Sequence, residues 1–184
     1  MFDDLADTEL MLLLADGQDL ALNELVRRWR ERVAAFLLRM THDRGTALDL
    51  TQETFVRLYR SRTRYRANAA FPSFLFTVAA NLARDHARWR KRHPSVPLED
   101  ATATRIPDTS VIPDAAAANR EELAAVESAI SELPSDLREA LLLYVYEDLG
   151  YGEIASILGC TPKAVETRIY RARQMLKANW ARGG

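Results

Sequence analysis

The last helix that the sequence predicts carries basic and hydroxyl side chains at positions that can share an outward face. These residues are Lys163, Thr167, Arg168, Tyr170, Arg171 and Arg173. Such side chains reach base edges from the N-terminal part of a helix and phosphates from the rest of it. The alternative is a solvated basic helix that only ends the chain. The spacing, with the turn that precedes it, favours DNA recognition.

The residues before this helix predict a helix-turn-helix. Ile154 and Ala155 lie on the inner face of a short helix, and Gly159 suits the left-handed position at its end. Thr161 can cap the next helix, and Pro162 fits its first turn because no amide donor is needed there. The small side chain of Ala155 lets two helices cross closely, as this motif requires.

No residue cluster has the spacing of a catalytic or metal site. The three histidines show no metal-ligand spacing with Cys160, and no nucleophile lies beside an evident base. A single cysteine also excludes an internal disulfide framework. We therefore expect a protein without enzyme activity, cofactor or metal.

Apolar residues that recur at three- and four-residue steps predict helices along most of the chain. The expected helices span residues 20–40, 48–59, 74–92, 121–133, 135–146 and 151–158, and the basic helix follows. In the second of them the expected inward face consists of Leu48, Thr51, Phe55, Leu58 and Tyr59. Pro94 is expected to end the third helix.

Four prolines and a run of alanines interrupt this pattern over residues 94–119. A structureless stretch of this length is unusual inside one compact domain. We therefore predict an all-α protein of two small helical domains, residues 1–93 and 120–184, joined by a flexible linker over 94–119. The second domain carries the helix-turn-helix.

The charge of the chain is distributed unevenly. A net charge of −1 over 184 residues argues by itself against a nucleic-acid binder. However, acids crowd the N-terminus and residues 121–153, while bases crowd residues 84–92 and 168–182, which predicts two separate basic surfaces. No apolar run is long enough to span a membrane and no signal peptide is evident, so we expect a cytoplasmic protein.

Three segments resemble the extracytoplasmic-function (ECF) sigma factors of bacterial RNA polymerase. Residues 49–59, DLTQETFVRLY, resemble the core-binding segment called region 2.2, and residues 71–86, FPSFLFTVAANLARDH, resemble region 2.4. Residues 151–173, which end in TRIYRAR, resemble region 4.2. The three segments occur in the order of the family and cover nearly the whole chain.

The resemblance implies an alternative sigma factor, which binds core RNA polymerase and directs promoter recognition and transcription initiation. Asp49, Gln52 and Glu53 then bind the β′ clamp helices, where carboxylates suit the arginines expected there. The β flap is the second implied polymerase contact. The outward residues of the last helix then read the −35 element.

The resemblance also places recognition and melting of the −10 element in the first domain. The implied DNA contacts are Tyr65, Asn68, Phe71, Asn81, Arg84 and Arg88. An extruded base needs stacking surfaces and an amide that both donates and accepts hydrogen bonds. We expect Asn81 to supply the amide, Tyr65, Asn68 and Phe71 to form the pocket walls, and the arginines to bind the DNA backbone.

One departure from the family bears on regulation. Thr46, Ala47, Leu48 and Asp49 stand where Asp-Ala-Glu-Asp is frequent, so two negative charges are missing from the core-binding helix. A phosphate can restore negative charge and pair with arginines. We hypothesise that a Ser/Thr protein kinase activates the protein at Thr51, with Thr46 as the second candidate. Sequestration by an anti-sigma factor is the competing form of control.

A dimeric helix-turn-helix transcriptional regulator that acts without core polymerase is the alternative function. It accounts for the C-terminal motif, but it leaves Asp49, Glu53 and Asn81 without a role. It also predicts tight binding to duplex DNA by the protein alone, whereas a sigma factor needs the polymerase.

Overall fold

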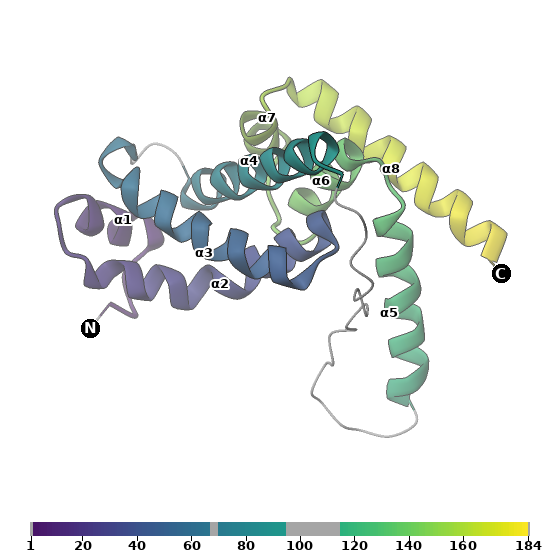
Figure 1. Cartoon of the computed structure of the whole chain (residues 1–184), viewed down its shortest axis with the longest axis horizontal. Helices are drawn as coiled ribbons and strands as arrows, with labels where there is room; N and C mark the ends of the chain where they lie inside the picture. Colours follow the sequence, from purple (N-terminus) through teal and green to yellow (C-terminus); the bar gives the residue numbers. More distant parts are fainter. Residues whose placement is uncertain (1, 67–69, 95–114, 184) are drawn as a thin grey trace.

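The computed structural model describes residues 2–66, 70–94 and 115–183, with the backbone alone for 115–122 and 181–183 (Figure 1). The elements are α1 (Asp7–Ala15), α2 (Leu20–Thr41), α3 (Arg44–Arg60), the short 3-10 helix η1 (Arg62–Arg64), α4 (Phe71–Arg92), α5 (Ala115–Ser131), α6 (Ser135–Val145), α7 (Tyr151–Leu158) and α8 (Pro162–Gly183). The described residues contain no strand, which confirms the predicted all-α class.

An aromatic cluster holds α2 and α4 together. Trp29 and Phe36 of α2 meet Phe76 of α4 edge to face, with ring centroids 6.2 and 5.4 Å apart. Phe71, at the start of α4, packs against Trp29 in the same way at 5.7 Å. All four rings are buried, so each contributes apolar area as well as a favourable ring contact.

The first helix, α1, is an element that the sequence analysis did not predict. Its apolar residues Leu10, Met11 and Leu14 are fully buried in the core. Asp7 accepts hydrogen bonds from the guanidinium of Arg28 at 3.0 Å and from the indole of Trp29 at 2.9 Å, which ties α1 to α2. A helix of nine residues is marginal on its own, so tertiary packing decides its formation.

Three helix starts differ from those predicted, and the first is that of α3, which begins at Arg44 rather than at residue 48. Helix α4 begins at Phe71, because Pro72 is accommodated in the first turn, where no amide donor is needed. Helix α5 begins at Ala115, so residues 115–119 are helical and do not belong to the linker; alanine has the highest helix propensity. Residues 95–114 of the predicted linker lie outside the described residues.

The helix-turn-helix of α7 and α8 has the predicted caps. Gly159 ends α7 with a φ of 63°, in the left-handed region. The Thr161 hydroxyl accepts a hydrogen bond from the Ala164 amide at 3.2 Å and so caps α8. Ala155 and Val165 are buried where the two helices cross.

The C-terminal helices pack against the N-terminal ones. Helix α7 lies against α4, and α5 and α6 contact α2 (Figure 1). The far end of α8 extends away from this contact (Figure 1). The chain therefore brings a face of α4 and the helix-turn-helix together.

We expect the core of α2 to be sensitive to truncation. Leu37→Ala should lower the free energy of unfolding by about 2–5 kcal/mol, because Leu37 is fully buried and its loss leaves a cavity. Leu20→Ala in the same helix is the matched control, and it should cost less than about 0.5 kcal/mol because Leu20 is 66% exposed. Urea unfolding measures both; equal losses would contradict the described core.

Candidate nucleic-acid and protein interfaces

The outward face of α8 presents the basic residues that the sequence analysis selected. Lys163, Thr167, Tyr170, Arg171 and Arg173 are exposed, whereas Val165 and Ile169 of the same helix are buried. This division follows from the helical period, because residues three and four apart share a face. These side chains face solvent, although Lys163 pairs with Glu166 at 2.8 Å and the Arg173 guanidinium lies 5.2 Å from the centroid of the Tyr144 ring.

Arg168 differs from its neighbours on α8. Its guanidinium lies 3.7 Å from the Cys160 sulfur and 3.7 Å from a carboxylate oxygen of Asp136, and its side chain is 30% exposed. These contacts hold Arg168 against the turn and against α6. The residue is therefore placed to support the helix-turn-helix.

Asn81 is exposed on α4, one turn before the first of the expected phosphate-binding arginines. The Arg84 guanidinium donates to the Asn81 side-chain oxygen at 2.7 Å, which leaves the Asn81 amide group as a donor toward solvent. Arg88 is exposed and pairs with Asp85 on the same helix. The structure thus brings Asn81, Arg84 and Arg88 onto neighbouring positions of one helix.

A cation-rich hollow of about 350 Å³ lies beside Asn81, between α4 and the end of α3. It is lined by Arg57, Arg60, Ser61, Arg64, Val78 and Asn81. Three arginines among the lining residues favour an anionic ligand, since arginine binds phosphate with several donors at once, although Arg57 is also paired with Glu53 at 2.8 Å. Sequence reasoning missed Arg57 and Arg60, because on the sequence they are only two basic positions of a helix.

Two of the three expected pocket walls, Tyr65 and Phe71, are buried. Tyr65 is 5% exposed and meets the ring of Phe74 edge to face at 5.3 Å, and Phe71 is 1% exposed in the aromatic core. Neither residue lines the hollow at Asn81, and the apolar area of both is buried in the fold. Asn68 lies outside the described residues.

Helix α3 presents a mixed acidic and apolar ridge. Asp49 and Gln52 are exposed, and Glu53 is partly exposed and accepts a hydrogen bond from Arg57 at 2.8 Å. Leu48 and Val56 flank them and are 43% and 42% exposed. The expectation that Leu48 faces the core is wrong, because Ala47 and Thr51 occupy the inward positions of this turn.

The structure does not support the phosphorylation hypothesis. Thr51 is only 4% exposed, and its hydroxyl donates to the Ala47 carbonyl at 2.7 Å, so a kinase cannot reach it in the folded chain. Thr46 is half-buried in the first turn of α3, where its amide donates to the Asp43 carboxylate at 2.6 Å. The exposed ridge of this helix is partly apolar.

We expect a charge at position 51 to destabilise the fold. Thr51→Glu should lower the free energy of unfolding by at least about 2 kcal/mol, because it places a carboxylate among buried groups. The near-isosteric Thr51→Val should cost no more than about 1 kcal/mol, since the Ala47 carbonyl keeps its helical partner. Thermal unfolding of both variants checks this; a Thr51→Glu protein as stable as wild type would contradict it.

Glu139 is a buried carboxylate at the contact between the N-terminal helices, α1–α4, and the C-terminal helices, α5–α8. Its nearest cation across the contact is Arg84 of α4, whose Nε lies 3.8 Å from Oε1, beyond hydrogen-bond reach. Burial raises the pKa of Glu139 to about 7, while Arg84 and Arg168 oppose the shift and Asp136 adds to it. The long ion-pair distance explains why burial dominates.

We expect Glu139 to make stability depend on pH. Its pKa is higher in the folded chain than the usual 4.5, so its stabilising effect is complete below pH 4.5 and is lost as the pH rises through about 7. Between pH 5 and 8 the wild type should lose about 2 kcal/mol that Glu139→Gln does not lose. Urea unfolding at both pH values measures the difference, with Glu31→Gln at an exposed position as the control. Equal pH dependence in the wild type and Glu139→Gln would refute this role.

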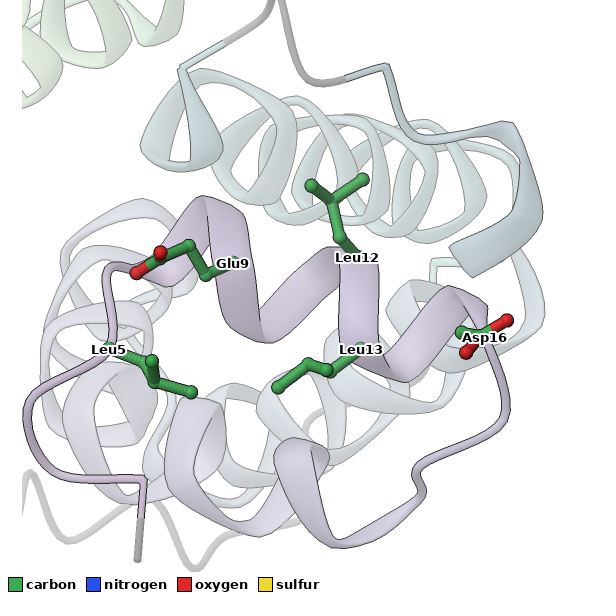
Figure 2. A pocket seen from close by; sticks show the side chains of 5 residues that line it. All are labelled: Leu5, Glu9, Leu12, Leu13 and Asp16. Carbon is green, nitrogen blue, oxygen red and sulfur yellow. The ribbon is translucent and has the colours of Figure 1, made fainter.

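In residues 2–66, 70–94 and 115–183, no three His, Cys, Asp or Glu side chains gather in a metal-binding arrangement. Over the same part of the chain, no helix is long and apolar enough to cross a membrane. A second hollow of about 440 Å³ lies along α1, where Leu5 and Leu13 point toward each other and Glu9 and Asp16 lie toward opposite ends (Figure 2).

Two basic helix faces, on α4 and α8, and a separate ridge on α3 are exposed, as the class of promoter-recognition subunits would require. Comparison with protein families agrees with this class. Residues 25–93 match the model described as Sigma-70 region 2, and residues 123–176 match Sigma-70, region 4. The chain belongs to the sigma-70 family and, within it, to the ECF-type sigma factors.

Full-length relatives lead to the same family. RNA polymerase sigma-H factor of Pseudomonas aeruginosa is 33% identical over 177 residues, which cover 92% of this chain and 91% of the relative. The ECF RNA polymerase sigma-E factor of Haemophilus influenzae is 33% identical over 184 residues, or 96% of each chain. Sigma factors direct promoter recognition together with core RNA polymerase and are not enzymes, and this membership replaces the alternative of a dimeric regulator.

Solved structures agree with the fold. CnrH, solved in complex with the cytosolic domain of CnrY, has a TM-score of 0.73 at 27% identity, over 97% of this chain and 99% of that one. Sigma factor RpoE of Bartonella quintana, solved with the anti-sigma factor NepR, has a TM-score of 0.65 at 22% identity, over 86% and 96% of the two chains.

Proposed function

We propose that Asn81 and the hollow beside it form the site that reads the −10 element. The proposal depends on one observation. The exposed side-chain amide of Asn81 lines a hollow that is also lined by Arg57, Arg60 and Arg64. An extruded base can pair with the amide while the arginines hold the adjoining phosphates. Arg84 and Arg88 continue the basic surface along α4, toward the DNA backbone.

The outward face of α8 is the proposed −35 reader. Lys163 and Thr167 lie nearest the N-terminal end of the helix, which enters the major groove in helix-turn-helix proteins. Tyr170, Arg171 and Arg173 lie further along and suit the phosphates. In this assignment residues 1–93 form the −10 unit and residues 120–184 the −35 unit, with the connecting residues between them.

The ridge on α3 is the proposed contact with the β′ clamp helices. Asp49, Gln52 and Glu53 offer polar groups to basic partners, and exposed Leu48 and Val56 offer apolar area beside them. Interfaces with an apolar centre and a polar rim are typical of stable protein contacts. The apolar flanks compensate for the two negative charges that the family pattern has and this helix lacks.

Two further protein contacts follow from family membership. Leu123 of α5 and Trp180 of α8 are 60% and 52% exposed, and we assign them to the β flap, because exposed large apolar side chains mark binding surfaces. CnrH, a solved relative at 27% identity, is in complex with the cytosolic domain of CnrY, which supports control by an anti-sigma protein. Phosphorylation is not part of the proposal, since Thr51 is buried.

The test is transcription by purified core polymerase with this protein on a promoter selected from genomic fragments. Asn81→Ala should lower promoter-dependent initiation about 2- to 10-fold, the range that one lost hydrogen bond produces, because the base loses the donor of the Asn81 amide. It should also abolish discrimination against a changed base at the contacted −10 position. Asn23→Ala, at an exposed position of α2, is the matched control and should leave both quantities unchanged.

The same assay separates DNA reading from polymerase binding. Asp49→Arg should weaken binding to core polymerase about tenfold or more and lower initiation equally on every promoter, because a like charge then faces the basic clamp. Asp4→Arg, exposed at the N-terminus, controls for the change of charge. Normal −10 discrimination in Asn81→Ala would sink the assigned role of Asn81, even with polymerase binding intact.

A further inference from the structure

Three aromatic side chains, His86, Trp89 and His93, form a ladder along the C-terminal part of α4. The rings of His86 and Trp89 are inclined at 26° with centroids 6.4 Å apart, and those of Trp89 and His93 stack at 23° and 5.0 Å. Trp89, in the middle, is 51% exposed. We propose that the Trp89 ring stacks on an unpaired DNA base, so that the aromatic ladder is a second base-contacting site on α4. This inference rests on the proposed −10 role of Asn81.

The neighbouring rings hold Trp89 in place although half of its surface is open to solvent. The three residues are three and four positions apart, so their side chains lie on one face of the helix. The His93 ring is fixed in turn, because its Nδ1 donates to the Trp89 carbonyl at 3.1 Å. A side chain that is already ordered loses little conformational freedom when a ligand binds to it. The aromatic ladder is therefore preorganised for stacking.

His86 connects the aromatic ladder to the folded body of the N-terminal helices. Its ring is partly buried, and burial together with the nearby Arg90 lowers the pKa of His86, while Asp43 at the start of α3 opposes the shift. The imidazole is therefore mostly neutral at neutral pH. A neutral imidazole gives the indole an aromatic packing surface at the inner end of the ladder.

The packing of the fold does not account for an aromatic side chain at position 89. The buried residues of α4 end at Ala83, and Trp89 is not among the residues that pack against the core. Among the described residues, none accepts a hydrogen bond from its indole N–H. A large apolar side chain that is exposed in this way marks a binding surface. Truncation of Trp89 should therefore leave the protein folded.

The charges around Trp89 favour nucleic acid as the ligand. Residues 86–93 contain four arginine or lysine side chains and no acid. Over the part of the chain that the structure describes, Arg90, Lys91 and Arg92 are exposed and form no ion pair with a carboxylate. Proteins bind single-stranded nucleic acid through cations that contact the phosphates and aromatic rings that stack on the bases. The end of α4 offers both groups within two helical turns.

The position of Trp89 relative to Asn81 suits two bases of one DNA strand. Trp89 follows Asn81 by eight residues on α4, and positions eight apart lie on the same side of a helix. A rise of about 1.5 Å per residue separates the two positions by about 12 Å along the helix axis. One DNA strand advances about 3.4 Å per nucleotide, so this separation corresponds to about three or four nucleotides. The base at Trp89 is therefore expected three or four positions from the base at Asn81.

The experiment is a double-mutant cycle between the Trp89 ring and the DNA bases. Core polymerase with the full-length protein binds a promoter oligonucleotide whose −10 region is an unpaired bubble, and an abasic site replaces each nucleotide of the bubble in turn. Trp89→Ala should weaken binding to the intact bubble about 5- to 150-fold, the range of one lost base–aromatic stack. Trp89→Phe keeps a ring and should cost less than about threefold. Leu20→Ala, at an exposed position of α2, is the control and should leave binding unchanged.

At one position of the bubble, the abasic site and Trp89→Ala together should cost no more than either change alone. Additive losses at every position would overturn the base contact, because the ring would then act on a phosphate or on a protein partner. Weaker binding of Trp89→Ala to core polymerase without DNA would overturn it too. The same scan with Asn81→Ala locates the base at Asn81 separately. Coupling for Asn81 but not for Trp89 would therefore leave the proposed function standing.

Discussion

The burial of four aromatic rings between α2 and α4 is the constraint on which the rest of the molecule depends. Trp29, Phe36, Phe71 and Phe76 point inward from their helices, and their edge-to-face contacts fix how the two helices lie. Once these faces are buried, residues on the other faces of α4 must point outward. Asn81 and its neighbouring arginines owe their exposure to this packing, and α3 and η1 then supply the other wall of the hollow.

The contact between the two groups of helices follows a different physical rule. It combines charged pairs, one cation–π contact and a guanidinium among helix ends, so much of its strength depends on geometry and on the surrounding ions. The aromatic core, in contrast, is stabilised by the burial of apolar area. A charged or polar ligand does not compete for that area. The contact between the N-terminal and C-terminal helices is therefore more sensitive to salt than the aromatic core.

Helix α3 shows how one helix can serve both the core and a partner. Its inward positions carry Thr51 and Thr54, whose hydroxyls are satisfied by carbonyls one turn earlier. Because those hydroxyls are internal, the chemistry of the outer ridge is set by Asp49, Gln52 and Glu53 and by the apolar Leu48 and Val56. The ridge combines fewer charges with more apolar area than an acidic cluster would.

The sequence by itself determined the features that local interactions control. The long helices follow from apolar period, and the turn before α8 follows from the conformational freedom of Gly159 and the capping hydroxyl of Thr161. The basic face of α8 follows from the same period. These features depend on residues within a few positions of one another, so one chain's pattern is enough to predict them.

Only the tertiary structure decided the features that distant residues make together. It buried Tyr65 and Phe71, exposed Leu48, formed α1 against α2, and joined Arg57, Arg60 and Asn81 around one hollow. It also seated α7 on α4, which no local pattern indicates. The physical reason is that burial and ion pairing depend on which helix faces meet in space. Sequence periodicity predicts which face of a helix is apolar, but it does not predict which other helix packs against that face.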